Sequence, residues 1–163
     1  MRKALFPGSF DPFHNGHLEV VETASRLFEL IVIAPIRNPQ KSPAMFSLEE
    51  RRAMIAASVD HLANVEVSQY EEPMLVVDVA RAVGADVIVK GLRVSSDAES
   101  ELQQAQMNKA VSGVETVLVP CSSVYSFIAS RWLRDFVKYG GADRVGAMVP
   151  APVFLAIKEK FAL

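Results

Sequence analysis

Two histidines stand three residues apart in a glycine- and proline-containing turn near the start of the chain, Phe6-Pro7-Gly8-Ser9-Phe10-Asp11-Pro12-Phe13-His14-Asn15-Gly16-His17. The turn follows a short apolar segment and opens an amphipathic run, an arrangement with which α/β proteins bind phosphates. Backbone amides near Gly16 and His17, together with the helix dipole, favour an anion at this helix start. His17 is placed to donate a ring proton to a phosphate oxygen, and we expect His14 to face the same ligand. The turn therefore predicts chemistry on a phosphate.

Two other interpretations of these histidines are open. They are packing or surface residues, or they bind a metal ion. His61 is the only other histidine, Cys121 is the only cysteine, and no His-Glu-x-x-His pattern occurs, so we expect no metal site made by the protein. A single cysteine also excludes an internal disulfide. We expect Cys121 to be unreactive because no histidine base stands beside it.

Cationic residues follow several of the predicted strands. Lys41 lies in the proline-containing segment 35–46, Lys90 and Arg93 follow the fourth strand, and the polar segment 122–131 follows the fifth. Ligands of open parallel sheets bind at the carboxyl ends of the strands, so these segments are expected to meet the first turn at one edge. An ordinary surface lysine is an equally good interpretation of Lys41. Trp132 is interpreted as a packing residue.

The elements that must position these groups alternate along the chain. Such alternation predicts a parallel sheet with helices on both faces. Short β-rich runs occupy Lys3–Phe6, Leu30–Ala34, Val65–Ser68, Val87–Val89 and Thr116–Val119. Helical patterns occupy Leu18–Phe28, a segment from the capping box Ser47–Glu50 to Val59, Leu75–Val83, Glu99–Val111, Phe127–Tyr139, and 152–161 after Pro152.

Length and charge limit the class of protein. With 163 residues the chain is expected to form one domain, 1–163. A net charge of −2 and a pI near 5.9 argue against bulk nucleic-acid binding. No apolar run approaches the roughly 20 residues of a membrane-spanning helix, and no secretory signal is recognisable. The expectation is a cytoplasmic protein that acts on a small anionic ligand.

The motifs, taken together, resemble the phosphopantetheine adenylyltransferase family of the HxGH nucleotidyltransferase superfamily. The resemblance covers essentially the whole chain. It rests on the opening turn and on Phe46–Arg51, Lys90-Gly91-Leu92-Arg93 and Tyr125–Ser130. The chain departs from the family pattern at several positions, among them Lys90 in place of the usual arginine and Arg131 in place of the usual serine.

The resemblance implies transfer of the adenylyl group of ATP to 4′-phosphopantetheine, which gives dephospho-coenzyme A and pyrophosphate. It also implies a Rossmann-like, doubly wound α/β fold with a five-stranded parallel sheet, and a homohexamer. Mg²⁺ is expected to arrive with ATP, because no all-protein cage is apparent. Another nucleotidyltransferase, acting on nicotinamide mononucleotide or using CTP, and a noncatalytic nucleotide-binding module remain as alternatives.

The resemblance also implies roles for individual residues. Its catalytic residues are His17, Lys41 and Arg93. The acceptor-binding residues are Ser9, Lys41, Val76 and Lys90. The ATP site comprises Ser9, Phe10, His17, Gly91, Leu92, Arg93, Glu101, Tyr125, Ser126, Phe127, Ile128, Ala129, Ser130 and Arg131.

Overall fold

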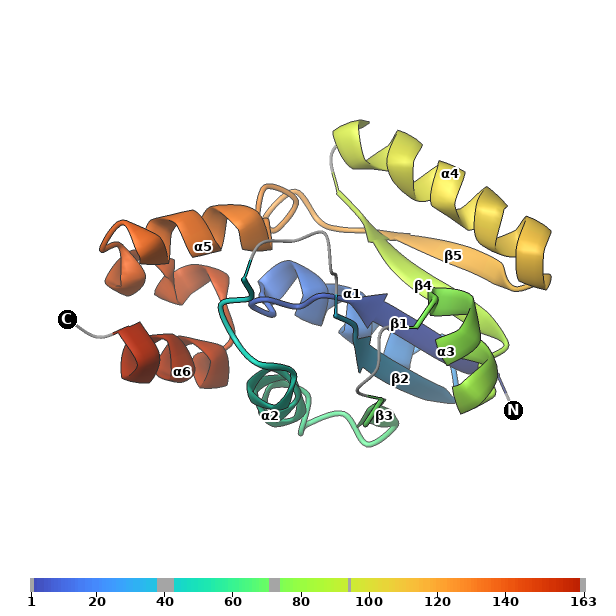
Figure 1. Ribbon diagram of the computed structural model, residues 1–163, viewed down its shortest axis with the longest axis horizontal. Helices are drawn as coiled ribbons and strands as arrows, with labels where there is room; N and C mark the ends of the chain where they lie inside the picture. The colour runs from blue at the N-terminus through green and yellow to red at the C-terminus, as the bar shows by residue number, and fades with distance from the viewer. Residues whose placement is uncertain (1, 38–42, 71–73, 94, 162–163) are drawn as a thin grey trace.

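The computed structural model describes residues 2–37, 43–70, 74–93 and 95–161 of the chain. Within these residues a five-stranded, wholly parallel sheet has the strand order β3-β2-β1-β4-β5 (Figure 1). The sheet and the α/β class confirm the prediction, and each strand lies within a few residues of its expected position. The strands are β1 (Lys3–Gly8), β2 (Leu30–Pro35), β3 (Val65–Val67), β4 (Val87–Leu92) and β5 (Glu115–Pro120).

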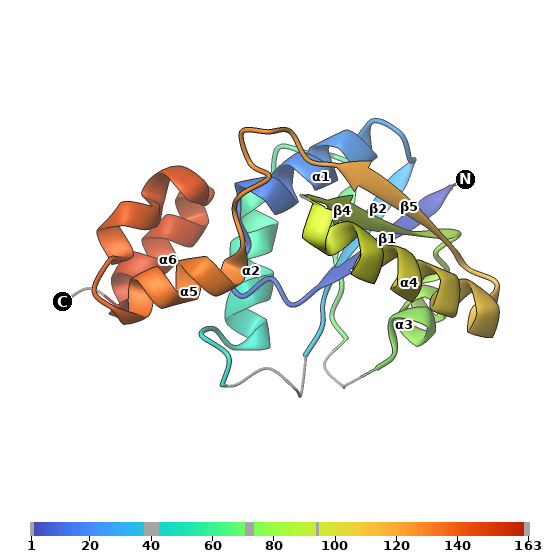
Figure 2. The same ribbon diagram turned by 90° about the horizontal axis from the view of Figure 1, so that it is seen from above.

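Helices cover both faces of the sheet. Helices α1 (Asn15–Ser25) and α2 (Leu48–Ser58) pack on one face, while α3 (Val76–Val83) and α4 (Ser95–Ser112) lie on the other, and Figure 2 shows α1 on the opposite side of the sheet from α3 and α4. The alternation of side chains along β1 produces these two layers. Ala4 and Phe6 join the core beneath α1 and α2, and Leu5 joins the core beneath α3.

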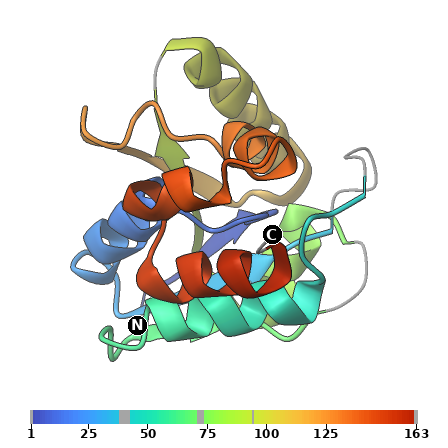
Figure 3. The same cartoon turned by 90° about the vertical axis from the view of Figure 1, so that its left-hand side faces the viewer.

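Three further helical segments lie beyond the carboxyl ends of the strands. These are α5 (Ser130–Lys138), the 3₁₀ helix η1 (Ala142–Met148) and α6 (Ala151–Phe161). Helix α6 lies along α2 (Figure 3), and its Val153 and Ile157 are fully buried in the main core. The last helix therefore packs within the chain. No described helix combines the length and the apolar character that a membrane crossing requires.

Local sequence signals explain where several helices begin and end. Ser47 Oγ accepts a hydrogen bond from the Glu50 backbone N–H, and the Glu50 carboxylate accepts one from Ser47 N–H, which confirms the predicted capping box. Helix α3 ends at Gly84, whose φ of 66° suits glycine.

Other boundaries differ from the expected ones. Helix α1 begins at Asn15, three residues before Leu18, because His14 caps it. Helix α4 begins at Ser95 rather than Glu99. Helix α5 begins at Ser130 rather than Phe127. The preceding residues form a separate turn, and Ala129, with φ −137° and ψ 137°, is extended and so interrupts the helical backbone before α5.

Candidate active site

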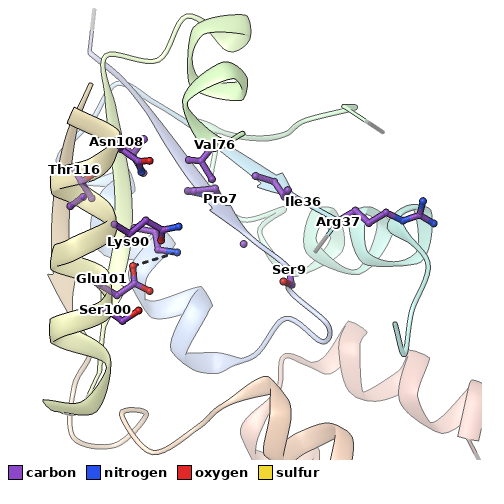
Figure 4. Close-up of a pocket in the computed structure, with 14 residues that line it drawn as sticks. Pro7, Ser9, Ile36, Arg37, Val76, Lys90, Ser100, Glu101, Asn108 and Thr116 are labelled. Atoms are coloured by element: carbon purple, nitrogen blue, oxygen red, sulfur yellow. Dashed lines mark ion pairs between the residues drawn. The ribbon is translucent and has the colours of Figure 1, made fainter. Parts of the chain in front are cut away.

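Two cavities open at the carboxyl edge of the sheet, on either side of the ends of β1 and β4. The first, here called the α1 cavity, has a volume of about 470 Å³ and lies among β1, α1, β4 and the start of α5. The second, the α4 cavity, has a volume of about 480 Å³ and lies among β1, β4, α3 and α4 (Figure 4). The neighbouring strands β1 and β4 mark the point where the strand order reverses, which is the usual ligand crevice of such sheets.

The two cavities have a common boundary. Its residues are Pro7, Gly8 and Ser9 at the end of β1, and Lys90 and Glu101 opposite them. A molecule in either cavity therefore reaches the same short stretch of backbone and the same ammonium group. This geometry suits a reaction between two ligands that approach one another from opposite faces of the sheet.

The two histidines of the opening turn bind each other's backbone. His14 Nδ1 accepts hydrogen bonds from the backbone N–H groups of Gly16, at 3.1 Å, and His17, at 3.3 Å. His17 Nδ1 accepts one from the His14 backbone N–H, at 3.2 Å. The ring proton of neutral His17 therefore lies on Nε2. The two amides expected to bind an anion already donate to His14, so this part of the sequence prediction is wrong.

The electrostatic state of His14 follows from its surroundings. The side chain is almost fully buried. Burial, and secondarily the positive charge of Arg93, lower the pKa of His14 from 6.5 to about 3. His14 is therefore neutral near pH 7 and acts as the N-cap of α1.

The His17 ring is held between aromatic groups. It stacks on His14 with ring centres 3.6 Å apart and on Phe13 at 5.4 Å, and the Phe10 ring stands perpendicular to it at 5.0 Å. Gly16 permits this packing, because a Cβ atom there would lie 2.9 Å from His14 Cε1. His17 also lines the α1 cavity, so a rigidly oriented imidazole faces that space.

Charge in the α1 cavity is mostly positive. Among its described lining residues the acid is Glu101 and the cations are Lys90, Arg93, Arg131 and Arg134. Arg93 Nη1 donates to the Ile128 carbonyl at 2.7 Å, which ties the end of β4 to the turn before α5. The excess of cations suits a polyanionic ligand such as a nucleoside triphosphate.

Lys90 and Glu101 form an ion pair at the common boundary. Lys90 Nζ lies 3.6 Å from Glu101 Oε2, and each side chain is 24% exposed (Figure 4). Glu101 Oε2 is buried and has no hydrogen-bond partner among the described residues. The pair thus places one positive and one negative group where the two cavities meet.

Comparisons with known proteins agree with this geometry. Residues 5–136 match the cytidylyltransferase-like family. A phosphopantetheine adenylyltransferase of Synechococcus sp. (strain JA-2-3B'a(2-13)) is 46% identical over 161 residues, which span 98% of each chain. One from Alkaliphilus oremlandii (strain OhILAs) is 41% identical over 99% of this chain and 100% of its own. The chain belongs to the phosphopantetheine adenylyltransferase family. The resemblance inferred from the motifs is confirmed.

A solved structure supports the fold of this phosphopantetheine adenylyltransferase family member. A putative nicotinate-nucleotide adenylyltransferase from Vibrio parahaemolyticus superposes with a TM-score of 0.65 over 96% of this chain and 99% of its own. The two sequences are only 18% identical, so the likeness concerns the fold alone.

Many positions that the family resemblance assigned do border the cavities. Val76 lines the α4 cavity, and Ser9 and Lys90 line both. The following line the α1 cavity: Phe10, His17, Gly91, Arg93, Glu101, Ala129, Ser130 and Arg131. Lys41 lies outside the described residues.

Other assigned positions line neither cavity. They are Leu92, Tyr125, Ser126, Phe127 and Ile128. Leu92 and Ile128 contribute backbone carbonyls that accept hydrogen bonds from Cys121 N–H and Arg93. Phe127 is 62% exposed and lies in the turn before α5. Their roles in nucleotide binding stay predictions.

Trp132 is not the packing residue expected from the sequence. It is 55% exposed on α5, with the Arg131 guanidinium 5.0 Å from the centre of its ring. Trp132 follows Arg131 directly, and the helix turns Leu133, not Trp132, into the core.

Several polar residues of the site were missed from the sequence. Gln104 and Asn108 line the α4 cavity. Gln104 follows Glu101 by three residues and Asn108 follows Gln104 by four, so the three share one helix face. This spacing was a usable signal. Arg134 on α5 and Arg51 on α2 also contact the opening turn. Arg51 ends the motif Phe46–Arg51, but nothing in the sequence shows which backbone carbonyl either arginine reaches.

Proposed function

We propose that this chain transfers the adenylyl group of ATP to 4′-phosphopantetheine and releases pyrophosphate, giving dephospho-coenzyme A. The observation that carries the proposal is the meeting of two cavities at Ser9 and Lys90. Adenylyl transfer joins two phosphorylated molecules, so it needs two adjacent sites whose phosphates approach one another.

The contents of the two cavities suggest which substrate each receives. The α1 cavity, with His17 and its arginines, suits the triphosphate of ATP. The α4 cavity combines apolar Ile36, Val76 and Ile88 with the amides of Gln104 and Asn108, which suits an extended arm carrying amide groups. Lys90 at the boundary would then bind the phosphate of that arm.

The chemistry is a direct in-line displacement. An oxygen of the phosphopantetheine phosphate attacks the α-phosphorus of ATP, the new P–O bond forms, and the bond to the β-phosphate oxygen breaks. The acceptor is already largely anionic at neutral pH, since the second pKa of a phosphate monoester is about 6, so no strong general base is needed. The protein contributes by orienting the two substrates and by stabilising the negative charge on the reacting phosphates.

We assign the charge stabilisation to three residues. His17 donates its Nε2–H to an oxygen of the reacting phosphate, because Nδ1 already accepts from the His14 backbone. Arg93 supports the nucleotide phosphates from the end of β4, and Lys41 neutralises charge on the phosphate being transferred. Lys41 enters this assignment from its family position alone.

The proposed reaction uses Mg²⁺. No group of three or more His, Cys, Asp or Glu side chains in the described part of the chain is arranged to hold a metal ion. We therefore assign Mg²⁺ to ATP, with which it enters and keeps several waters.

We also propose a cytoplasmic homohexamer. Exposed Leu102, Met107 and Val111 on α4 are apolar side chains that assembly would cover, and light scattering after size exclusion measures the mass.

Product analysis tests the proposed reaction. The chain is incubated with ATP, Mg²⁺ and 4′-phosphopantetheine, and mass spectrometry is expected to detect dephospho-coenzyme A and pyrophosphate in equal amounts. Parallel reactions replace the acceptor by nicotinamide mononucleotide, or ATP by CTP. A faster reaction with either substitute would overturn the assignment of substrates. Nucleotide binding without any product would favour a noncatalytic module.

A further inference from the structure

The opening turn is held by side chains from two distant helices. Arg51 Nη1, from α2, donates to the Ser9 carbonyl at 2.7 Å. Arg134 Nη1 and Ser130 Oγ, from α5, donate to the carbonyls of Asp11 and Pro12, each at 2.8 Å. Three carbonyls of the turn thus accept hydrogen bonds from side chains far along the chain, which help to hold its shape.

The Arg51 contact differs from the other two because Arg51 borders neither cavity. Arg134 and Ser130 both line the α1 cavity and are placed to touch a ligand themselves. Arg51 is only 4% exposed and reaches the site through the Ser9 carbonyl. The hydrogen bond to Ser9 links Arg51 to a residue that lines both cavities, so we expect its effect on the reaction to pass through the position of Ser9.

The guanidinium of Arg51 joins two fixed points. Its Nη1 donates to Ser9, and its Nε donates to the Ser47 carbonyl at 3.3 Å, where α2 begins. The start of α2 is fixed in turn by its capping box and by Lys160, whose Nζ bonds both carboxylate oxygens of Glu50 at 2.7 and 2.9 Å. The planar guanidinium thus connects the well-fixed start of α2 to the Ser9 carbonyl and restrains the opening turn.

The buried Asp11 carboxylate favours the positive charge of Arg51. The backbone N–H groups of Met45 and Phe46 donate to the buried Asp11 carboxylate, each at 2.8 Å. Burial lowers the pKa of Arg51, Asp11 opposes this by favouring the charged form, and the neighbouring Arg37 and Arg52 lower the pKa further. A guanidinium stays charged under such conditions, so the contact persists over the working pH range.

We propose that Arg51 is a positioning residue for adenylyl transfer, which fixes the Ser9 carbonyl and so holds Ser9 where the two cavities meet. The inference rests on the proposed function, since Ser9 has this importance only if both substrates meet there. Lysine at position 51 keeps the charge but lacks the fork that reaches two carbonyls at once. Arg51→Lys should therefore leave substrates bound but poorly aligned.

Arg52 offers a matched control. It is the next residue of α2, it is 9% exposed, and it also donates to backbone carbonyls, those of Ser68 and Tyr70. These two carbonyls lie just after β3, away from the opening turn. Arg51→Lys and Arg52→Lys thus each alter a buried guanidinium, and among the described hydrogen bonds the one to Ser9 is lost in the first variant.

The experiment measures thermal unfolding and steady-state kinetics of both variants, well below their melting temperatures. We expect similar losses of stability. For Arg51→Lys we expect kcat to fall by about 10²-fold, the scale of a small misplacement at a reacting centre, with KM for either substrate changed less than about threefold. Arg52→Lys should keep kcat within about threefold of the parent. An unchanged kcat in Arg51→Lys, or equal losses of kcat in both variants, would overturn the proposal.

Two further measurements complete the test. The double variant Arg51→Lys/Ser9→Ala should lose clearly less kcat than the product of the two single-variant losses, because both changes reduce the contribution of Ser9. Fully multiplicative losses of kcat would contradict the proposal. If Arg51→Lys does not fold, Arg51→Gln is held to the same criteria. Failure of the parent chain to form dephospho-coenzyme A would count against the proposed function instead.

Discussion

His14 and His17 exchange hydrogen bonds across the first turn of α1: the backbone N–H of each donates to Nδ1 of the other. These hydrogen bonds fix the tautomers of both rings, and the two histidines have different roles. His14 is a neutral, buried helix cap, whereas His17 faces the α1 cavity with Nε2 as its donor.

Removing the His17 imidazole should impair the chemical step. We expect His17→Ala to lower kcat by about 10²–10³-fold, the usual cost of one charge-stabilising donor, with a smaller effect on ATP binding. A pyrophosphate-release assay measures the rate. His61→Ala is the control, because His61 pairs with Glu22 on the surface. Turnover close to normal in His17→Ala would contradict the assigned role.

His14 should make stability depend on pH. The pKa of His14 is about 3 in the folded chain and 6.5 in the unfolded one. Between pH 3 and 6.5, His14 is therefore largely protonated in the unfolded state and neutral in the folded state. The free energy of unfolding therefore falls as pH drops below 6.5, by up to about 1.4 kcal/mol per pH unit from this group.

The variant His14→Asn isolates this effect, since asparagine also caps helices but does not titrate. Urea unfolding at pH 7.5, 6.0 and 5.0 compares the two chains. We expect the parent to lose stability more steeply than the variant below pH 6.5. Equal slopes would show that His14 is not the group responsible.

Lys90 should act mainly on the acceptor. Loss of a charged hydrogen-bond partner costs about 1.5–3 kcal/mol, so Lys90→Ala is expected to weaken 4′-phosphopantetheine binding by about tenfold or more, measured by calorimetry. ATP affinity should change less. Lys109→Ala, which removes an exposed lysine paired with Glu115, should leave both affinities unchanged. Unaltered acceptor affinity in Lys90→Ala would reject the assignment.

Ser47 should contribute to stability through its cap. Ser47→Ala removes the acceptor for the Glu50 backbone N–H and is expected to cost about 1 kcal/mol in urea unfolding. Ser25→Ala, which removes a hydroxyl bonded to the Glu22 carbonyl at the end of α1, should cost less than about 0.5 kcal/mol. A larger effect in the Ser25 variant would argue against the capping contribution.

The elements could be predicted because their signals are local. The apolar run at Val87–Val89, the capping box at Ser47 and the glycine at position 84 each involve neighbouring residues only. Prediction failed where a signal was unusual or incomplete. Histidine is an uncommon N-cap, so the start of α1 was placed too late, and the turn 122–128 resembles a helix start although Ala129 is extended.

The site could be predicted only in part, for a similar reason. Ser9, His17 and Arg93 come after strands and Lys90 lies near the carboxyl end of β4, and the strand-end rule brings them to one edge. Arg51 and Arg134 are different, because their importance lies in which backbone carbonyl they reach, 42 and 123 residues away in sequence. Many surface arginines look the same in the sequence.

By itself, the amino-acid sequence determined the alternation of strands and helices, the glycine turn with its two histidines, and the family, because these depend on residue types at short spacings. Only the tertiary structure decided that β4 lies beside β1, so that two cavities meet at Ser9 and Lys90. It also decided that the α1 amides expected to bind an anion donate to His14 Nδ1 instead. Both outcomes depend on which polar groups packing brings within hydrogen-bond distance, and sequence spacing does not specify that.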